Sequence, residues 1–144
     1  MINDIIYGIT KALNQEFEGV PVYAEPLKQG FKEPCFFVYC TESTNRIYLG
    51  KRYLAQNVFC VTYFPKLSNR QKEECNDVAE RLCNCLECVD IDDAAGGQIR
   101  GTNMKHTVSD SVLVFTLNYD AFYYKSELVE VMESLEKQDI TAKG

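Results

Sequence analysis

The sequence predicts a single α+β domain, with a mostly antiparallel sheet of four to five strands and flanking helices. Hydrophobic residues make up 46% of the 144 residues, which is enough for one core and leaves little room for a second domain. Segments with helical spacing of apolar residues alternate with short runs typical of strands. Because the gaps between consecutive strands are of hairpin length, we expect antiparallel pairing with the helices packed on the sheet.

The chain is expected to open with a helix and a short strand. Apolar residues recur at helical spacing over 2–17. Asn3 or Asp4 is expected to cap the start of this helix, and Gly19 is expected to end it. A short strand is then expected over 20–24.

Three strands are expected in the next part of the chain. The continuous apolar run over 35–40 is typical of a strand covered on both faces. Residues 46–54 and 57–64 are rich in aromatic and β-branched side chains. We therefore expect these two segments to pair with each other as a hairpin.

The strongest helical pattern begins at Ser68. Gln71 follows three residues later, as a capping box requires. One apolar stripe then runs along this helix, and its members are Cys75, Val78, Ala79, Leu82 and Leu86.

The last third of the chain is expected to form a hairpin and a closing helix. A polar strand over 98–108 precedes a turn at Ser109 and Asp110, and a long strand covers 111–124. On this last strand one face carries Leu113, Phe115, Leu117, Tyr119, Ala121 and Tyr123. An amphipathic helix with an acidic outer face is expected after it, from Leu128, Val131, Met132 and Leu135. We therefore expect an α+β domain over 1–125 and a C-terminal helix with a frayed tail over 126–144.

Several predicted strands carry apolar residues on both faces. Three modest helices can cover one face of a four- or five-stranded sheet, and the second face then needs another partner. Because large apolar patches are rare on stable monomers, a second copy of the chain is the simplest cover. The alternative is a monomeric sandwich in which the sheet folds over on itself.

Composition narrows the functional classes. The net charge of −6 disfavours nonspecific binding to nucleic acid, so no direct nucleic-acid specificity is expected. No stretch approaches the roughly 20 apolar residues of a membrane span, and the N-terminus lacks the basic start and apolar run of a secretory signal. We expect a cytosolic protein whose seven cysteines are reduced and mostly buried.

Cys83, Cys85 and Cys88 are the first candidates for a metal or redox site, because thiolates are good zinc ligands. On a helix, Cys83 and Cys85 lie roughly 160° apart around the axis. They cannot both reach one ion unless the helix ends first. The spacing is also not that of a C-x-x-C pair, so buried or partly buried thiols are the preferred interpretation.

Other chemical motifs are incomplete. His106 has Ser109, Asp110 and Ser111 nearby in the sequence, but no nucleophile-elbow glycines surround either serine. Gly50 and Lys51 resemble the end of a phosphate-binding loop that lacks its first glycine and its Ser or Thr. Asp90, Asp92 and Asp93 lack the calcium-loop pattern, and Gly96 and Gly97 lack the dinucleotide fingerprint. We therefore assign no catalytic residue, metal ligand or cofactor.

Arg46, Lys51, Arg52 and Tyr53 form a basic, aromatic patch on a predicted strand. One interpretation is an edge strand protected by its charge. The other is a self-assembly interface that contacts an acidic surface, such as the acidic C-terminal helix of a neighbouring copy. The sequence favours neither, so these four residues stand as the candidate interface.

An ordered set of segments carries a resemblance over most of the chain, from about Ile2 to Tyr124. The segments are Lys32-Glu33-Pro34-Cys35-Phe36-Phe37, Leu49-Gly50-Lys51-Arg52-Tyr53, the stretch 74–82, Ile99-Arg100-Gly101-Thr102 and Asn118-Tyr119-Asp120. In this order they resemble the tail terminator family of phages and prophages of Gram-positive bacteria. The stretch after Lys125 lies outside the resemblance.

The resemblance implies a non-enzymatic structural protein of the virion tail, assembled in the bacterial host cytoplasm. It implies a ring, usually of six copies, that caps the tail tube protein, ends tail polymerisation and presents a joining surface to a head-completion protein. It implies no cofactor and no membrane. Two alternatives stay open: another head–tail connector or neck protein, and a small metal or redox protein that uses Cys83, Cys85 and Cys88.

Overall fold

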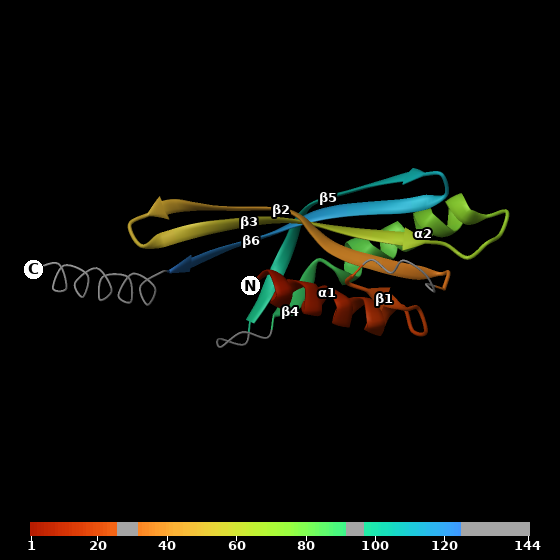
Figure 1. Ribbon diagram of the computed structural model, residues 1–144, viewed down its shortest axis with the longest axis horizontal. Helices are drawn as coiled ribbons and strands as arrows, with labels where there is room; N and C mark the ends of the chain where they lie inside the picture. The colour runs from red at the N-terminus through yellow and green to blue at the C-terminus, as the bar shows by residue number, and fades with distance from the viewer. Residues whose placement is uncertain (26–31, 92–96, 125–144) are drawn as a thin grey trace, which may run out of the picture.

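In the part of this α+β chain that the structure describes, the sheet has six strands in the order β1-β2-β3-β6-β5-β4, and two helices accompany it (Figure 1). The computed structural model describes residues 1–25, 32–91 and 97–124. Strand β1 pairs with β2 in parallel, and the other neighbours pair antiparallel. The elements are α1 (Ile2–Glu16), β1 (Val22–Tyr23), β2 (Cys35–Leu49), β3 (Arg52–Phe64), α2 (Gln71–Cys85), β4 (Cys88–Ile91), β5 (Gly97–Ser109) and β6 (Val112–Tyr124).

The single α+β domain is confirmed in outline, but the expected sheet of four to five strands is wrong: it has six strands and is mixed. Strand β4 was not expected, because it has only four residues and follows α2 after a short turn. The expected helix beyond Lys125 lies outside the described residues, as do Gly96, Asp92 and Asp93.

Strands β2 and β3 form one long hairpin, so the expected strand over 46–54 is wrong. Leu49 pairs with Arg52, which leaves Gly50 and Lys51 as a two-residue loop in the middle of that stretch. Gly50 has a φ of +59°, a conformation that glycine adopts without steric cost and that tight hairpin loops need at this position. The glycine therefore places the turn where the flanking residues favoured a strand.

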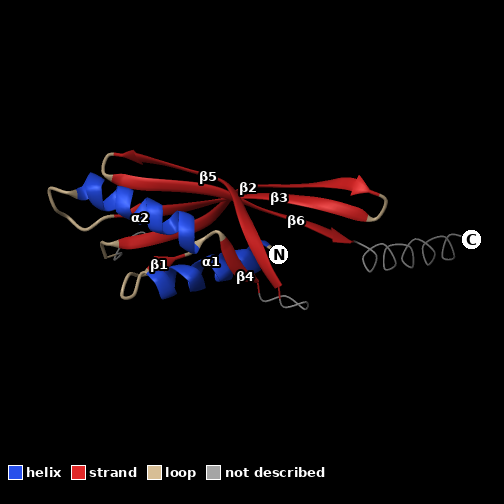
Figure 2. Ribbon diagram, turned by 180° about the vertical axis from the view of Figure 1, so that it is seen from behind, coloured by secondary structure: helices blue, strands red, loops and turns tan. Residues whose placement is uncertain are grey.

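The core lies between one face of the sheet and both helices (Figure 2). Ile5, Ile9 and Leu13 of α1 and Leu82 of α2 are fully buried against it. Alternate residues of the central strands complete this core, namely Phe36, Val38, Phe59, Val61, Tyr63, Leu113, Phe115, Leu117 and Tyr119. The inward face predicted for β6 is confirmed from Leu113 to Tyr119.

The other face of the central sheet is mixed. Cys35 and Cys60 are buried there, Phe37 and Phe64 are half-buried, and Tyr39 is 45% exposed. Both described helices lie against the opposite face. The expectation of a strand covered on both faces over 35–40 is therefore met only in part.

Helix α2 begins at Gln71, three residues later than the expected cap at Ser68, so the capping box is wrong. The Ser68 hydroxyl accepts from the Arg70 N–H at 3.2 Å, and the Gln71 amide donates to the Lys66 carbonyl at 3.3 Å. Glu74 instead accepts from the Tyr63 hydroxyl and the Lys66 N–H, both at 2.9 Å. These bonds join the first turn of α2 to the end of β3.

Strand β5 pairs with β4 over its first four residues, 97–100, and with β6 from Gly101 onward. Its register on β6 shifts between Thr102 and Lys105, and Asn103 has a φ of 52°. Bulges of this kind bend a strand. The first four residues of β5 carry β4 against α1 (Figure 1).

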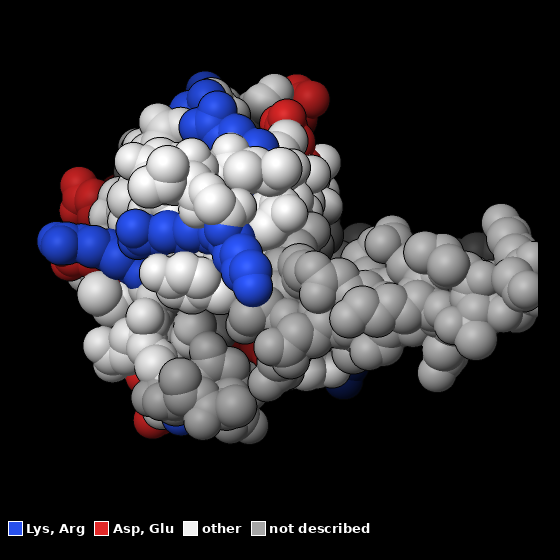
Figure 3. Space-filling view, turned by 90° about the vertical axis from the view of Figure 1, so that its left-hand side faces the viewer, with Lys and Arg blue, Asp and Glu red and all other residues white. Residues whose placement is uncertain are grey.

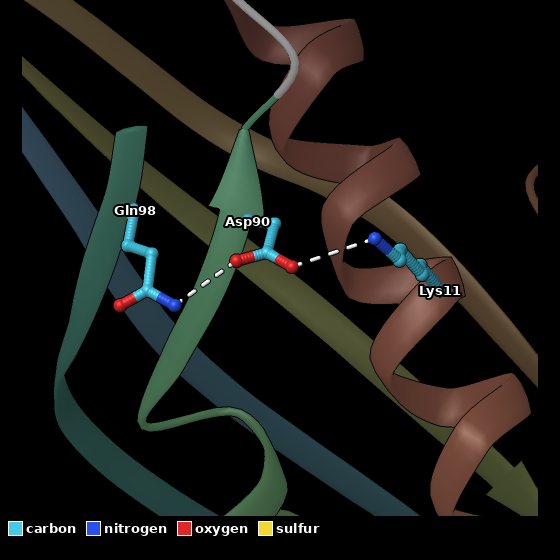
Figure 4. A network of polar contacts seen from close by, with 3 residues as sticks. All are labelled: Lys11, Asp90 and Gln98. Carbon is cyan, nitrogen blue, oxygen red and sulfur yellow. Dashed lines mark hydrogen bonds and ion pairs between the residues drawn. The ribbon is translucent and has the colours of Figure 1, made fainter. Parts of the chain in front are cut away.

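A glycine and a polar network fix β4 on α1. At Gly8 an added Cβ would meet the carbonyl oxygen of Asp90, so only glycine allows this approach. The Asp90 carboxylate accepts from Gln98 at 3.0 Å and from Lys11 at 3.4 Å (Figure 4). These two hydrogen bonds, with the Lys11 charge, lower the pKa of Asp90. Asp90 thus has a structural role.

Candidate assembly surface

Strands β2, β3 and β6 continue beyond the part of the sheet that the helices cover and form a projecting arm (Figures 1 and 2). We define the arm as residues 43–57 of the β2–β3 hairpin together with 119–124 of β6. Throughout it β3 is the central strand, because it pairs with β2 on one side and β6 on the other. The arm therefore has two faces and one tip, at Gly50 and Lys51.

A buried amide holds the base of the arm. Asn57 is 1% exposed, and its Nδ2 donates to the Tyr119 carbonyl at 3.2 Å. The Ser43 hydroxyl donates to Asn57 Oδ1 at 2.7 Å. Since a buried polar group is costly unless it is hydrogen-bonded, these contacts favour one arrangement of the three strands where they leave the core.

One face of the arm carries an arginine packed on aromatic rings. The guanidinium of Arg52 lies 4.2 Å from the centre of the Phe122 ring and 5.8 Å from that of Tyr48. The two rings are 4.9 Å apart, edge to face. Such cation–π and aromatic contacts stabilise a strand end that has no core beneath it.

The opposite face of the arm carries a tyrosine pair. The rings of Tyr53 and Tyr123 stack at 5.7 Å, and the Tyr123 hydroxyl donates to Asn45 Oδ1 at 3.0 Å. Residues on one strand alternate between faces, so Tyr53 lies on the other side of β3 from Arg52.

The structure brings only part of the predicted interface together. Arg46 pairs with Leu54, and therefore shares a face with Arg52. Lys51 occupies the turn beside them and is exposed. Tyr53 does not join these three. The expectation that all four residues share one strand is wrong, because the Gly50 turn separates Arg46 from Arg52.

Sequence reasoning missed the apolar character of the arm. Ile47 is 66% exposed, Leu49 is 74% exposed and Tyr124 is 69% exposed. The signal was present, since Ile47, Tyr48 and Leu49 directly precede a turn glycine. Viewed from this end, lysine and arginine side chains cross the surface and acidic ones lie at its margin (Figure 3). The tip thus presents positive charge beside exposed apolar side chains.

A groove of about 510 Å³ lies where the end of α1, the first half of α2 and the end of β3 meet. Phe17, Val20 and Val78 supply its apolar lining. Five carboxylates line it, those of Glu16, Glu18, Glu73, Glu74 and Asp77, together with Arg70 and Arg81. We call this the acidic groove.

Of the two arginines in the acidic groove, Arg81 already forms an ion pair within the same molecule. Arg81 Nε lies 3.0 Å from Glu16 Oε1, and a terminal nitrogen of Arg81 donates to the Glu16 carbonyl at 2.6 Å. Its guanidinium lies 4.1 Å from the centre of the Phe17 ring. By contrast, Glu18, Glu73 and Asp77 are exposed and form no ion pair with any residue that the structure describes. The groove therefore keeps an excess of negative charge.

The cysteines predicted as an alternative site are dispersed. Cys83 and Cys88 are exposed, whereas Cys85 is half-buried. Burial, and secondarily the charge of Glu16, raises the pKa of the Cys85 thiol to about 12. Within 1–25, 32–91 and 97–124, no three His, Cys, Asp or Glu side chains are grouped closely enough to hold a metal ion.

The histidine candidate is an exposed strand residue, as expected. His106 lies on β5 opposite Phe115. Asp110 and Ser111 form the β5–β6 turn with φ values of 51° and 61°. No hydrogen bond joins His106 to Ser109, Asp110 or Ser111 in the described structure. The arrangement does not form a triad.

Comparison with known proteins identifies the family of the chain. In the described regions, neither helix has the length and apolar character needed to cross a bilayer. No curated protein matches the sequence. A family model described as phage tail terminator protein matches residues 4–130, which takes in every described strand and nearly all of α1. The chain therefore belongs to the phage tail terminator family, whose members have a structural role in the phage tail.

Proposed function

We propose that this protein caps the phage tail tube as a ring, ends tail polymerisation and forms the surface on which the head is joined. Its partners are then copies of itself, in a ring of six as the family resemblance implies, the tail tube protein and a head-completion protein. It assembles in the host cytoplasm and remains in the virion tail. The family match over residues 4–130 is the observation that carries this proposal.

The geometry of the arm supports self-association. A stable monomer rarely leaves neighbouring large apolar side chains in water, yet Leu49 and Tyr124, which both pair with Arg52 and share its face, are mostly exposed. The hydrogen bonds of Asn57 and the Arg52 contacts hold the arm in place without a partner. A preformed projection of this kind loses little conformational entropy when it binds.

Negative-stain electron microscopy and mass measurement of the purified protein test the ring. We expect rings, with a mass several times the 16.5 kDa of one chain, either free at high concentration or on tail tubes. Purified tail tubes provide the second arm of the experiment. Binding to their ends, with arrest of further tube growth, is the expected result.

A head–tail connector or neck protein is the alternative function. Tail tubes and empty capsids, offered separately, distinguish the two. Binding to tubes and not to capsids supports a terminator. Binding to capsids alone would replace the proposed function with that of a connector.

A further inference from the structure

We propose that the basic tip of the arm docks into the acidic groove of a second copy, head to tail. The tip consists of Arg46, Leu49, Lys51 and Arg52, and the groove lies between α1 and α2 of the next molecule. This inference rests on the proposed function, since it assigns the contact through which copies associate.

The tip and the groove have complementary chemistry. Arg46 and Lys51 are exposed cations, and Leu49 between them is the most exposed apolar residue of the arm. Asp120 is the one carboxylate on the described residues of the arm. The groove offers the exposed carboxylates of Glu18, Glu73 and Asp77, which form no ion pair with a described residue, around an apolar lining. Opposite charges that surround an apolar contact are typical of specific protein interfaces.

A single strand separates the two surfaces and prevents the tip from reaching its own groove. Strand β3 begins at Arg52 in the tip, and its Tyr63 lines the groove. At about 3.3 Å per residue the eleven steps between them span roughly 36 Å. Figure 1 places the hairpin tip at one end of the molecule and the start of α2 at the other. Docking must therefore occur between molecules.

The contact is heterologous when each copy gives its tip to one neighbour and its groove to another. Repetition of a heterologous contact closes a ring when the rotation between copies permits it, and otherwise gives a filament. A two-fold dimer would instead place each tip in the groove of the same partner, and assembly would then stop at two subunits. The position of the two surfaces thus provides the kind of contact that a ring requires.

Charge reversal and charge exchange test the docking. The tip variant is Lys51→Glu, with Arg46→Glu as a second, independent tip variant. The groove variant is Glu73→Lys with Asp77→Lys. Lys105→Glu on β5 and Glu80→Lys on α2 are matched controls, because both residues are exposed and neither belongs to the tip or the groove. Association is measured by light scattering at low ionic strength, and circular dichroism reports folding.

We expect each tip variant and the groove variant to lose about tenfold or more in association, whereas the controls associate as the wild type does. A protein that carries both Lys51→Glu and Arg46→Glu has a tip of net negative charge. Mixing this double variant with the groove variant should restore assembly, because an acidic tip then meets a basic groove. Equal behaviour of Lys51→Glu and Lys105→Glu would overturn the docking, as would a mixture that stays monomeric. A wild type that remains monomeric at high concentration and low salt also overturns it.

Failure of the docking and failure of the proposed function give different results. A Lys51→Glu protein that still forms rings on tail tubes would refute only the docking. A wild type that binds no tail tube would refute the function. Folded, monomeric Lys51→Glu that binds tube ends without forming rings there would support the docking, because contact with the tube and contact between copies are then separate.

Discussion

Single buried side chains set the stability of the helix-covered part of the molecule. Leu82 is fully buried between α2 and the sheet. We expect Leu82→Ala to lower the free energy of unfolding by about 2–5 kcal/mol, because it removes apolar contacts and leaves a cavity. Leu67→Ala is the matched control, since Leu67 is 84% exposed, and its effect should stay within about 0.5 kcal/mol. Urea unfolding measures both, and equal effects would contradict this placement of Leu82.

The thiols should differ sharply in reactivity. The thiolate is the reactive form, and a pKa of about 12 leaves about one in ten thousand Cys85 thiols ionised at pH 8. We therefore expect iodoacetamide to label Cys83 and Cys88 in the folded protein at pH 8 and to spare Cys85. All seven cysteines should react in denaturant. Rapid native labelling of Cys85, detected by peptide mass spectrometry, would reopen the redox interpretation.

The raised pKa of Cys85 also makes the free energy of unfolding depend on pH. Burial favours the protonated Cys85 thiol in the folded state, so its pKa is raised from the ordinary thiol value of 9.0 to about 12. The unfolded chain loses this proton first. The stabilising contribution of Cys85 is therefore complete below pH 9 and falls as the pH rises towards 12. Cys85→Ala, which cannot ionise, is the control for that slope.

At the scale of elements, the contact between α1 and β4 depends on the absence of one side chain. Alanine normally stabilises a helix interior by about 1 kcal/mol relative to glycine. In Gly8→Ala the new methyl group would collide with the backbone carbonyl of Asp90, which cannot move aside cheaply. We expect a net destabilisation of about 1–3 kcal/mol, measured by urea unfolding. Gly97→Ala, where no atom lies within 4 Å, should be close to neutral.

Elements that follow from a local pattern of apolar residues could be predicted from the sequence. Elements whose position depends on contacts with distant parts of the chain could not. The inward face of β6 follows from alternation, and burial of Leu113 to Tyr119 confirms it. The start of α2 did not follow from Ser68, because Glu74 bonds to Tyr63 on another element and the helix begins later. Strand β4 pairs with the start of β5 and lies against α1, contacts that no local pattern in its four residues reveals.

The basic character of the candidate assembly surface could be predicted from the sequence, but its position in the fold could not. Lys51 and Arg52 are visible in the sequence as part of a basic patch. Their place at the end of a projecting arm depends on the turn at Gly50 and on the pairing of β6 along β3. The acidic groove unites Glu18 of one helix end with Asp77 of the other helix, and no sequence spacing reveals that proximity.

At the scale of the whole molecule, the docking requires that each copy carries one tip and one groove that act independently. Variants that remove charges without reversing them test this independence, because they create no new pairs of opposite charges. Lys51→Ala with Arg46→Ala removes the positive charge of two tip residues, and Glu73→Gln with Asp77→Asn removes two groove carboxylates. In an equal mixture only one productive contact is available, between the intact tip of the groove variant and the intact groove of the tip variant.

That contact leaves an impaired tip and an impaired groove at the two ends, so assembly should stop at two subunits. Sedimentation velocity of the mixture should show a species of about twice 16.5 kDa, while each variant alone stays monomeric and the wild type forms larger assemblies. A mixture of Lys105→Ala with Glu80→Gln, which leaves both surfaces intact, should assemble fully. If the tip and groove variants together form assemblies as large as those of the wild type, additional surfaces must join the subunits. Head-to-tail contact would then not be the basis of the ring.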